Sequence, residues 1–204
     1  MNDIAENKLS DYILVEKVLG GDTHAFSVII SNTERLVAQI IFKMIDDDED
    51  KRDIAQDVYL KAFQKLGSFK FQAKLSTWIG HIAYNACCNY LEKKKLVLVN
   101  NTYNNDRTDE ELLESLSSNK NLNNETESLI FKSELSQILK IEIDKLSPLY
   151  KTLITLFHTE ELSYAEIGQI TELPDGTIKN YLFRARKTLK ENLLKNYKRE
   201  DLSL

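Results

Sequence analysis

Apolar residues recur at helical spacing along most of the chain, and this periodicity predicts a protein built from helices. Only two prolines and six glycines interrupt a sequence rich in Leu, Ile, Lys and Glu, which favours the same conclusion. Breaks fall at Gly20 and Gly21, at the acidic cluster that begins with Asp46, and at the irregular stretch GSFKFQAK. Four helices are therefore predicted in the N-terminal half, over residues 11–19, 22–45, 52–66 and 77–95.

Short polar residues mark the beginnings of two of these helices. Asp22 or Thr23 is expected to cap the second helix, and Ser76 or Thr77 the fourth, because a side-chain oxygen can accept the first free N–H groups. Trp78 is expected to lie in the core beside Ile79 and Ile82. The predicted apolar face of the third helix consists of Ile54, Val58, Tyr59, Ala62, Phe63 and Leu66.

The pattern changes between residues 100 and 128, where asparagine, serine and acidic residues dominate. This composition is typical of a polar linker. A helical stripe returns over residues 129–146, and the Ser147 and Pro148 pair begins another helix that ends at His158. The predicted fold class is all-α, with two small helical domains (residues 1–96 and 129–204) joined by an acidic polar linker (residues 97–128).

Residues 163–187, SYAEIGQITELPDGTIKNYLFRARK, predict a helix-turn-helix. On its first helix, Tyr164, Ile167 and Ile170 are expected to face inward, and Pro174 follows where that helix ends. On its second helix, Ile178, Leu182 and Ala185 are expected to anchor the core side. The opposite face would present Lys179, Asn180, Arg184, Arg186 and Lys187, which are residue types that bind base edges and phosphates.

Charge is distributed in blocks, although the chain of 204 residues has a formal net charge of −5. Residues 46–57 hold seven acids and two bases, and residues 100–128 hold the same numbers. Residues 175–199 hold eight bases and two acids. Basic residues near a helix C-terminus also complement the helix dipole. This cluster alone is therefore equally explained by a helix that binds no DNA. The alternation indicates surfaces that meet different partners.

The composition excludes several other classes of protein. No apolar run has the length of a membrane span, and the N-terminus lacks the pattern of a signal peptide, so a cytoplasmic protein is expected. Cys87 and Cys88 are adjacent, and neither a disulfide nor a metal-ligand spacing is predicted from them. No cofactor is expected, and nothing orients His81, His158 or the cysteines as a nucleophile and base.

Two blocks of the sequence resemble the extracytoplasmic-function (ECF) sigma factors of bacteria. Residues 53–95 include STWIGHIAYN and resemble sigma domain two, which melts promoters. Residues 146–193 include GTIKNYLFRARKTL and resemble sigma domain four. The resemblance implies a protein without a catalytic site that binds core RNA polymerase, places it on promoter DNA and helps to open the duplex.

The resemblance also implies three sets of site residues. The set expected at the minus-thirty-five element is Thr177, Lys179, Asn180, Phe183, Arg184, Arg186 and Lys187. The set expected at the minus-ten element is Phe69, Lys70, Phe71, Lys74, Asn85, Asn89 and Lys93, although Phe69 could equally be core and Lys93 a solvated helix end. The set expected to bind core polymerase is Asp53, Gln56, Asp57 and Lys61, a polar helix face that could also simply be solvated.

Several positions depart from the common family pattern. Phe71 stands where glycine is frequent, and Tyr181 where a basic residue is common. Asp175 is expected to cap the recognition helix. Gly168 is expected to weaken its helix slightly, and Glu172, at a position that is often glycine, to distort the turn. These departures concern the promoter sequence that is read rather than the family.

Regulation is expected to involve a further partner. ECF sigma factors are often held inactive by an anti-sigma protein, commonly membrane-anchored, that covers the surfaces for polymerase and DNA. The acidic linker is either an inert tether or a segment that enters the cationic RNA path of the polymerase as a nucleic-acid mimic.

Three other functions explain less of the sequence. A helix-turn-helix regulator that binds operator DNA without polymerase would account for residues 163–190 but not for residues 53–95. A helical enzyme would require a nucleophile and base that the pattern does not supply. A protein-binding adaptor would use helix faces alone and would show no promoter preference.

Overall fold

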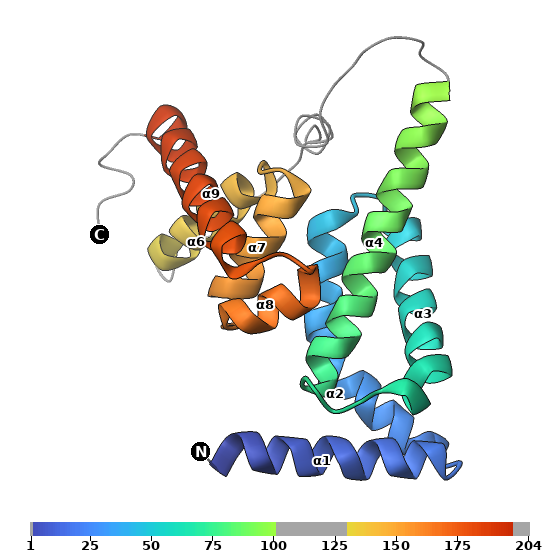
Figure 1. Cartoon of the computed structure of the whole chain (residues 1–204). Coiled ribbons are helices and arrows are strands. Elements are labelled where there is room, and N and C mark those ends of the chain that lie inside the picture. Colours follow the sequence, from blue (N-terminus) through green and yellow to red (C-terminus); the bar gives the residue numbers. More distant parts are fainter. Residues whose placement is uncertain (1, 101–129, 198–204) are drawn as a thin grey trace.

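The computed structural model describes residues 2–100 and 130–197, and every regular element in these two segments is a helix (Figure 1). The expected linker falls almost entirely outside the described residues. The elements are α1 (Asn2–Leu19), α2 (Thr23–Met44), α3 (Asp48–Lys65), the 3-10 turn η1 (Leu66–Ser68), α4 (Leu75–Asn100), α6 (Ile130–Asp144), α7 (Pro148–His158), α8 (Tyr164–Thr171) and α9 (Asp175–Asn196). The prediction of an all-α chain is confirmed.

Helices α1 to α4 form the N-terminal unit, in which α2 and α4 pack side by side and α3 covers them (Figure 1). The stripes predicted from periodicity lie inside, with Ile29, Ile40, Val58 and Ile79 fully buried. Burying one large aliphatic side chain contributes about 1.5–3 kcal/mol, so this shared core is the main reason that the helices associate.

Helix α2 is apolar and long enough to cross a membrane by composition and length alone. Its apolar side is instead the inward face of the N-terminal unit, where eight of its residues are buried. This arrangement is that of a central core helix.

The acidic cluster after α2 begins the next helix rather than only interrupting the chain. Asp47 is the N-cap of α3, and its side chain accepts hydrogen bonds from the N–H groups of Glu49 and Asp50. The expected start at residue 52 was wrong, because the acids also occupy the first turn, where the helix dipole favours negative charge. Of the two residues expected to cap α2, Asp22 is the N-cap and Thr23 is the first residue of the helix.

The start of α4 was predicted incorrectly. The helix begins at Leu75, one residue before Ser76 and two before Thr77, the two expected caps. The N–H of Leu75 donates to Asp11 Oδ2 at 2.8 Å. Asp11 belongs to α1, so this cap is supplied from a distant part of the chain. Burial raises the pKa of the Asp11 carboxyl, against the opposing effects of this hydrogen bond and of Lys74.

Helices α6 to α9 form the C-terminal unit, and local capping defines its boundaries. Ser147 caps α7 and Pro148 is its first residue, as predicted. Ser163 and Glu166 form a reciprocal capping box at the start of α8. Such boxes satisfy two backbone donors within one turn, which explains why this boundary is visible in the sequence.

The turn between α8 and α9 bears on two expectations. Glu172 ends α8 in the left-handed conformation with φ 60°, which favours glycine, and its N–H still donates to the carbonyl of Gly168 at 2.8 Å. Asp175 is the first residue of α9 rather than its cap, a position that Pro174 takes. A methyl group on Gly168 would lie 3.1 Å from the Leu173 carbonyl, so glycine permits this close approach.

The two units pack directly against each other. Helix α2 contacts α7, and α4 contacts α8 (Figure 1). Ile170 of α8 is fully buried, and a methyl group on Gly80 of α4 would lie only 3.2 Å from Ile170 Cδ1. A glycine on α4 therefore lets α8 approach closely at this crossing.

Candidate nucleic-acid interface

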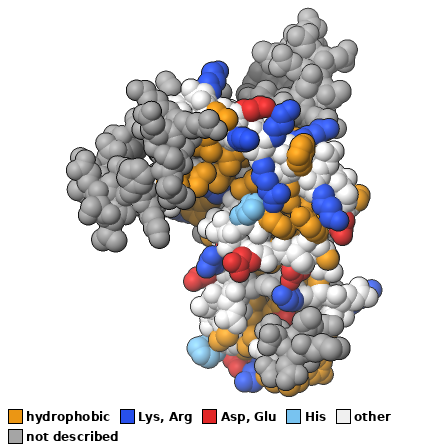
Figure 2. All heavy atoms as spheres, turned by 90° about the vertical axis from the view of Figure 1, so that its left-hand side faces the viewer, with side chains coloured by type: hydrophobic (Ala, Val, Ile, Leu, Met, Phe, Trp, Pro, Cys, Tyr) orange, Lys and Arg blue, Asp and Glu red, His pale blue; other side chains and the backbone are white. Residues whose placement is uncertain are grey.

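Helix α9 has one buried and one exposed face, as the sequence predicted. Ile178, Leu182 and Ala185 are buried in the C-terminal unit. Lys179, Asn180, Phe183, Arg184, Arg186 and Lys187 are exposed, and Thr177 is half-buried. Figure 2 shows Lys and Arg side chains gathered over the upper part of this side of the molecule, interspersed with hydrophobic side chains. Such a surface combines positive charge with an apolar contact, Phe183, which is 67% exposed.

Two cations of α9 lie over aromatic rings of neighbouring helices. Lys179 Nζ lies 5.3 Å from the centre of the Tyr164 ring, and the Arg186 guanidinium lies 5.3 Å from that of Phe157. Arg186 Nε also donates to His158 Nε2 at 3.2 Å. These contacts fix the directions of two side chains that would otherwise sample many rotamers.

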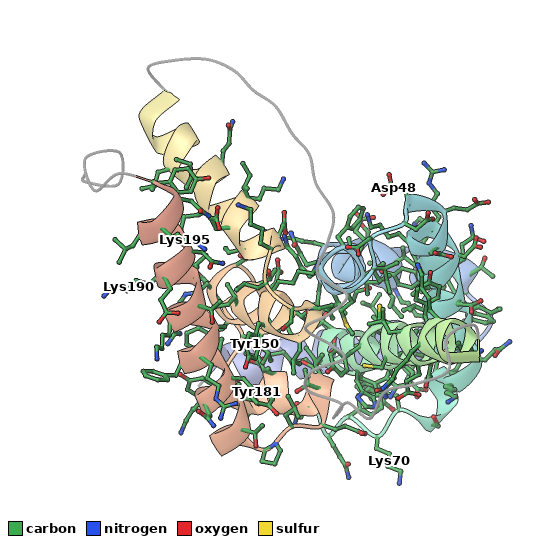
Figure 3. The ribbon with its side chains drawn as sticks, turned by 90° about the horizontal axis from the view of Figure 1, so that it is seen from above. Asp48, Lys70, Tyr150, Tyr181, Lys190 and Lys195 are labelled. Atoms are coloured by element: carbon green, nitrogen blue, oxygen red, sulfur yellow. The ribbon has the colours of Figure 1, made fainter. Side chains whose placement is uncertain are left out.

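The Arg186 contact requires an imidazole that can accept a hydrogen bond. Burial, and secondarily the Arg186 charge, lower the pKa of His158, which favours this neutral form. Tyr181, at the position where a basic residue is common, turns toward α7, and its ring centre lies 5.9 Å from that of Tyr150 (Figure 3). Lys190 and Lys195 project outward from the C-terminal part of α9 in the same view.

The loop between η1 and α4 contains both core and surface residues. Phe69 is only 8% exposed, and its ring centre lies 4.7 Å from that of Phe71 and 5.2 Å from that of Trp78. Of the two roles considered for Phe69, the structure therefore favours the core. The Phe69 ring supports the loop from beneath, and it could contact DNA directly only if the loop rearranged. Trp78 packs against the core, as expected.

Phe71 adopts a positive φ of 56°, the left-handed conformation that favours glycine. This backbone geometry gives a physical reason for the frequent glycine at that position in the family. Lys70 projects away from the body of the protein (Figure 3), and Lys74 Nζ lies 2.8 Å from Glu166 Oε1 of the C-terminal unit.

The face of α4 that was predicted to bind the minus-ten element lies beside α8. His81 Nδ1 donates to the carbonyl of Ile170 at 3.1 Å, and Asn85 Nδ2 donates to His81 Nε2 at 3.0 Å. Asn85 is half-buried, whereas Asn89 and Lys93 are exposed further along the helix. His81 thus aligns the Asn85 amide while it contacts the other unit.

The cysteines on α4 belong to the core side. Cys87 is buried, and burial raises the pKa of its thiol to about 12. Burial likewise raises the pKa of Cys88. Both thiols are therefore protonated at neutral pH and poor nucleophiles. Among the described residues, no group of three or more His, Cys, Asp or Glu side chains is placed to hold a metal ion.

Helix α3 presents the four residues that were predicted to bind polymerase. Asp53, Gln56, Asp57 and Lys61 are exposed, on the side opposite the buried Ile54, Val58 and Ala62. Lys61 Nζ lies 3.9 Å from Asp57 Oδ2, a surface pair of the kind that contributes little to stability.

Phe63 was predicted to lie on the inward face of α3, but it is 47% exposed. Its ring meets that of Phe26 edge to face at 5.0 Å, so α2 supports it without covering it. Leu60 is exposed nearby, and these apolar neighbours of the polar set were missed. Hydrophobic periodicity assigned Phe63 to the core because it lies on the apolar stripe, whereas Leu60 lies off that stripe, so its position among the exposed residues could have been read from the same pattern.

Two family models match separate parts of the chain. Sigma-70 region 2 matches residues 29–97, and sigma-70 region 4 matches residues 137–189. The chain is also 32% identical over 182 residues to the ECF RNA polymerase sigma-E factor of Escherichia coli strain K12. This alignment covers 89% of this chain and 93% of the relative.

Solved structures support the fold. CnrH, in complex with the cytosolic domain of CnrY, matches with a TM-score of 0.60 and 18% identity, over 92% of this chain and 99% of CnrH. The sigma factor RpoE, in complex with the anti-sigma factor NepR from Bartonella quintana, matches with a TM-score of 0.59 and 20% identity, over 84% of this chain and 98% of RpoE. The chain belongs to the ECF sigma factors, which bind core RNA polymerase and direct it to promoters to begin transcription.

Proposed function

We propose that α9 recognises the minus-thirty-five element, and the observation that carries this proposal is the separation of its two faces. The residues between its buried positions are cationic, amide-bearing or aromatic, which suits base edges and phosphates in a major groove. Lys179 and Asn180 lie early in the helix, where base contacts are made in helix-turn-helix proteins. Arg184, Arg186 and Lys187 lie later and suit the phosphates that set affinity.

The second part of the proposal concerns the minus-ten element. Lys70, Phe71 and Lys74 on the loop, with Asn85, Asn89 and Lys93 on α4, form a surface that combines amides, cations and an aromatic ring. Such groups suit an unpaired strand, in which bases stack on rings and phosphates meet cations. Phe69 acts from beneath, because its packing on Phe71 and Trp78 sets the position of the loop.

Helix α3 is proposed to dock on core polymerase. Its four exposed polar residues include acids and a lysine at helical spacing, and charge complementarity of this kind steers docking more than it adds affinity. The exposed side chains of Leu60 and Phe63 extend the same surface with apolar area. Fully desolvated apolar and aromatic residues supply most of the binding energy in typical interfaces.

An anti-sigma protein is the proposed regulatory partner. The structure of RpoE contains the anti-sigma factor NepR, and that of CnrH contains the cytosolic domain of CnrY. The similarity of fold supports an equivalent partner for this chain, and a membrane-anchored partner would fit a protein that acts in the cytoplasm. We assign the chain no catalytic site.

The test is transcription in vitro with core polymerase, the purified protein and a fragment library from its own genome. Start sites that depend on the protein and share two upstream elements are expected, and they would define the promoter sequence. Discrete binding to duplex DNA without any transcripts would instead favour an operator-binding regulator. A control reaction with the primary sigma factor of the same polymerase shows whether the core polymerase is active.

A further inference from the structure

Helix α1 contacts the loop between η1 and α4 at two points. The N–H of Leu75, where the loop ends, donates to Asp11 Oδ2 at 2.8 Å. At the next residue of α1, the ring centre of Tyr12 lies 5.4 Å from that of Phe71, within the loop, and the two ring planes are tilted by 47°. Two separate contacts therefore set the position of the Tyr12 side chain relative to the loop.

Tyr12 is the outermost ring of a series that leads from the core to the surface. Phe69 packs on Phe71, and Phe71 on Tyr12, with ring centres 4.7 and 5.4 Å apart. Exposure increases along the series: Phe69 is 8% exposed, Phe71 is half-buried and Tyr12 is 50% exposed. The inner ring thus supports the outer two, which remain open to solvent. Aromatic rings held in this way are the surfaces on which unpaired bases stack.

The backbone at Phe71 is strained to present this ring. Its φ of 56° lies in the left-handed region, which a residue with a side chain adopts at a cost in free energy. Such strain is most common at functional sites, where the surrounding structure maintains it. A glycine would adopt the same conformation without strain, but the ring beside Tyr12 would be lost. The strained backbone is therefore linked to the presence of an aromatic pair on this surface.

Charge on the loop indicates what covers the aromatic pair. Lys70 directly precedes Phe71 and projects away from the body of the protein (Figure 3). Lys74 follows on the same loop, and its side chain is 45% exposed. A single strand of DNA carries a phosphate for every base, so rings and cations that lie together suit it better than they suit an apolar protein surface. The pair also adjoins the surface that we assign to the minus-ten element.

We propose that Tyr12 and Phe71 form a stacking site for one unpaired base of the downstream promoter strand, so that α1 contributes directly to DNA binding. Tyr12 supplies a ring that the sequence did not identify. Asp11 is a positioning residue, because its bond to Leu75 holds α1 against the end of the loop. Stacking uses ring faces rather than hydrogen bonds, so the site adds affinity for opened DNA with little base preference. This inference rests on the minus-ten assignment made above.

The test uses the full chain, assembled with core polymerase, on a promoter fragment that gives transcripts in the assay above. Tyr12→Ala removes the outer ring and Tyr12→Phe keeps it. Ile13→Ala is the matched control, because Ile13 is 45% exposed on the same helix and has no ring. Phe71→Gly removes the second ring but permits the positive φ. The lifetime of the open complex after a heparin challenge is measured for each protein.

Tyr12→Ala should shorten this lifetime by about five-fold or more, as expected for the loss of one base–ring contact. Tyr12→Phe and Ile13→Ala should behave like the unchanged protein. Tyr12→Ala combined with Phe71→Gly should lose less than the product of the two single effects, because both rings hold the same base. Equal losses for Tyr12→Ala and Tyr12→Phe would overturn the proposal. Equal losses for Tyr12→Ala and Ile13→Ala would overturn it too, in favour of a protein contact on α1.

Photocrosslinking of the unchanged protein gives a readout that does not depend on how a variant folds. Iododeoxyuridine, which crosslinks to aromatic side chains stacked against it, replaces each base of the downstream element in turn on the non-template strand. Mass spectrometry of the joined peptide is expected to identify Tyr12 at one position or at two neighbouring positions. Crosslinks to Phe71 or α4 without any to Tyr12 would overturn the stacking site and leave the minus-ten assignment standing. No crosslink to the loop, α1 or α4 would overturn both.

Discussion

The two proposed DNA-binding surfaces are built alike but presented differently. On α9 and on α4, a buried apolar face holds the helix and the opposite face carries amides and cations. The face of α9 is exposed, whereas the N-terminal part of α4 lies against α8, with His81 bonded to the Ile170 carbonyl. The difference shows that the accessibility of a helix face depends on what packs beside it and not on the helix itself.

Helix α4 also begins differently from several of its neighbours. Local side chains cap α2, α3, α7 and α8, each within three residues of the groups that it caps: Asp22, Asp47, Ser147 and Ser163. The first N–H of α4 instead binds Asp11 of α1, 64 residues away. This helix, which we propose binds DNA, therefore depends on tertiary contacts for its start as well as for its exposure.

The largest effect is expected from adjacent residues on the two faces of α9. Leu182→Ala should lower the free energy of unfolding by about 2–5 kcal/mol, because Leu182 is buried and its loss leaves a cavity. Phe183→Ala should change it by less than about 0.5 kcal/mol, since surface substitutions rarely exceed this, while it weakens binding to upstream DNA. Urea unfolding of the full chain measures both. Similar losses for the two variants would contradict the assignment of the faces.

The next largest effect separates the two DNA-binding surfaces. Lys179→Ala should weaken use of the upstream element and Asn85→Ala that of the downstream element, each by about 1–3 kcal/mol, as for single base contacts. Transcription from templates with one altered element at a time measures each loss.

In the free chain, Asn85→Ala should change binding of single-stranded DNA less than it does in the polymerase complex, because Asn85 is half-buried beside α8. Interchanged losses, with each variant affecting the other element, would be inconsistent with both assignments.

A smaller effect tests the distant cap. Asp11→Ala should destabilise the N-terminal unit by about 0.5–2 kcal/mol, the range for loss of an N-cap side chain. Asp11→Asn keeps an acceptor for the Leu75 N–H and should retain most of the stability. Because burial raises the pKa of Asp11 in the folded chain, its negative charge opposes folding above that pKa, and the asparagine variant should gain relative stability as the pH rises from 3 to 7. Thermal unfolding at several pH values measures this, and a relative loss over that range would contradict it.

The smallest effect concerns pH and the C-terminal unit. The pKa of His158 is lower in the folded chain than its ordinary value of 6.5, so the unfolded chain binds the proton more readily. The contribution of neutral His158 is therefore present above pH 6.5 and is lost as the pH falls through 6.5 toward the folded pKa. His158→Gln keeps an acceptor for Arg186 and should show a smaller decrease in melting temperature on acidification. An equal decrease would argue against this role for His158.

Much of the candidate site could be predicted from sequence because its signals are local. Alternation of apolar and polar residues at helical spacing was enough to identify the two faces of α9 and the polar face of α3. The same reasoning failed at Phe63, which periodicity places inside and the structure leaves 47% exposed. It left Phe69 open between core and DNA, because a loop has no periodicity to assign its faces.

The sequence by itself determined the helices, most of their boundaries and the family, because spacing, capping residues and turn residues act within a few positions along the chain. Only the tertiary structure decided which surfaces are open. The cap of α4 by Asp11, the burial of Phe69 and the contact of Glu166 with Lys74 each join residues far apart in sequence. Such contacts follow from how helices pack, and packing depends on the shapes of whole faces rather than on local pattern.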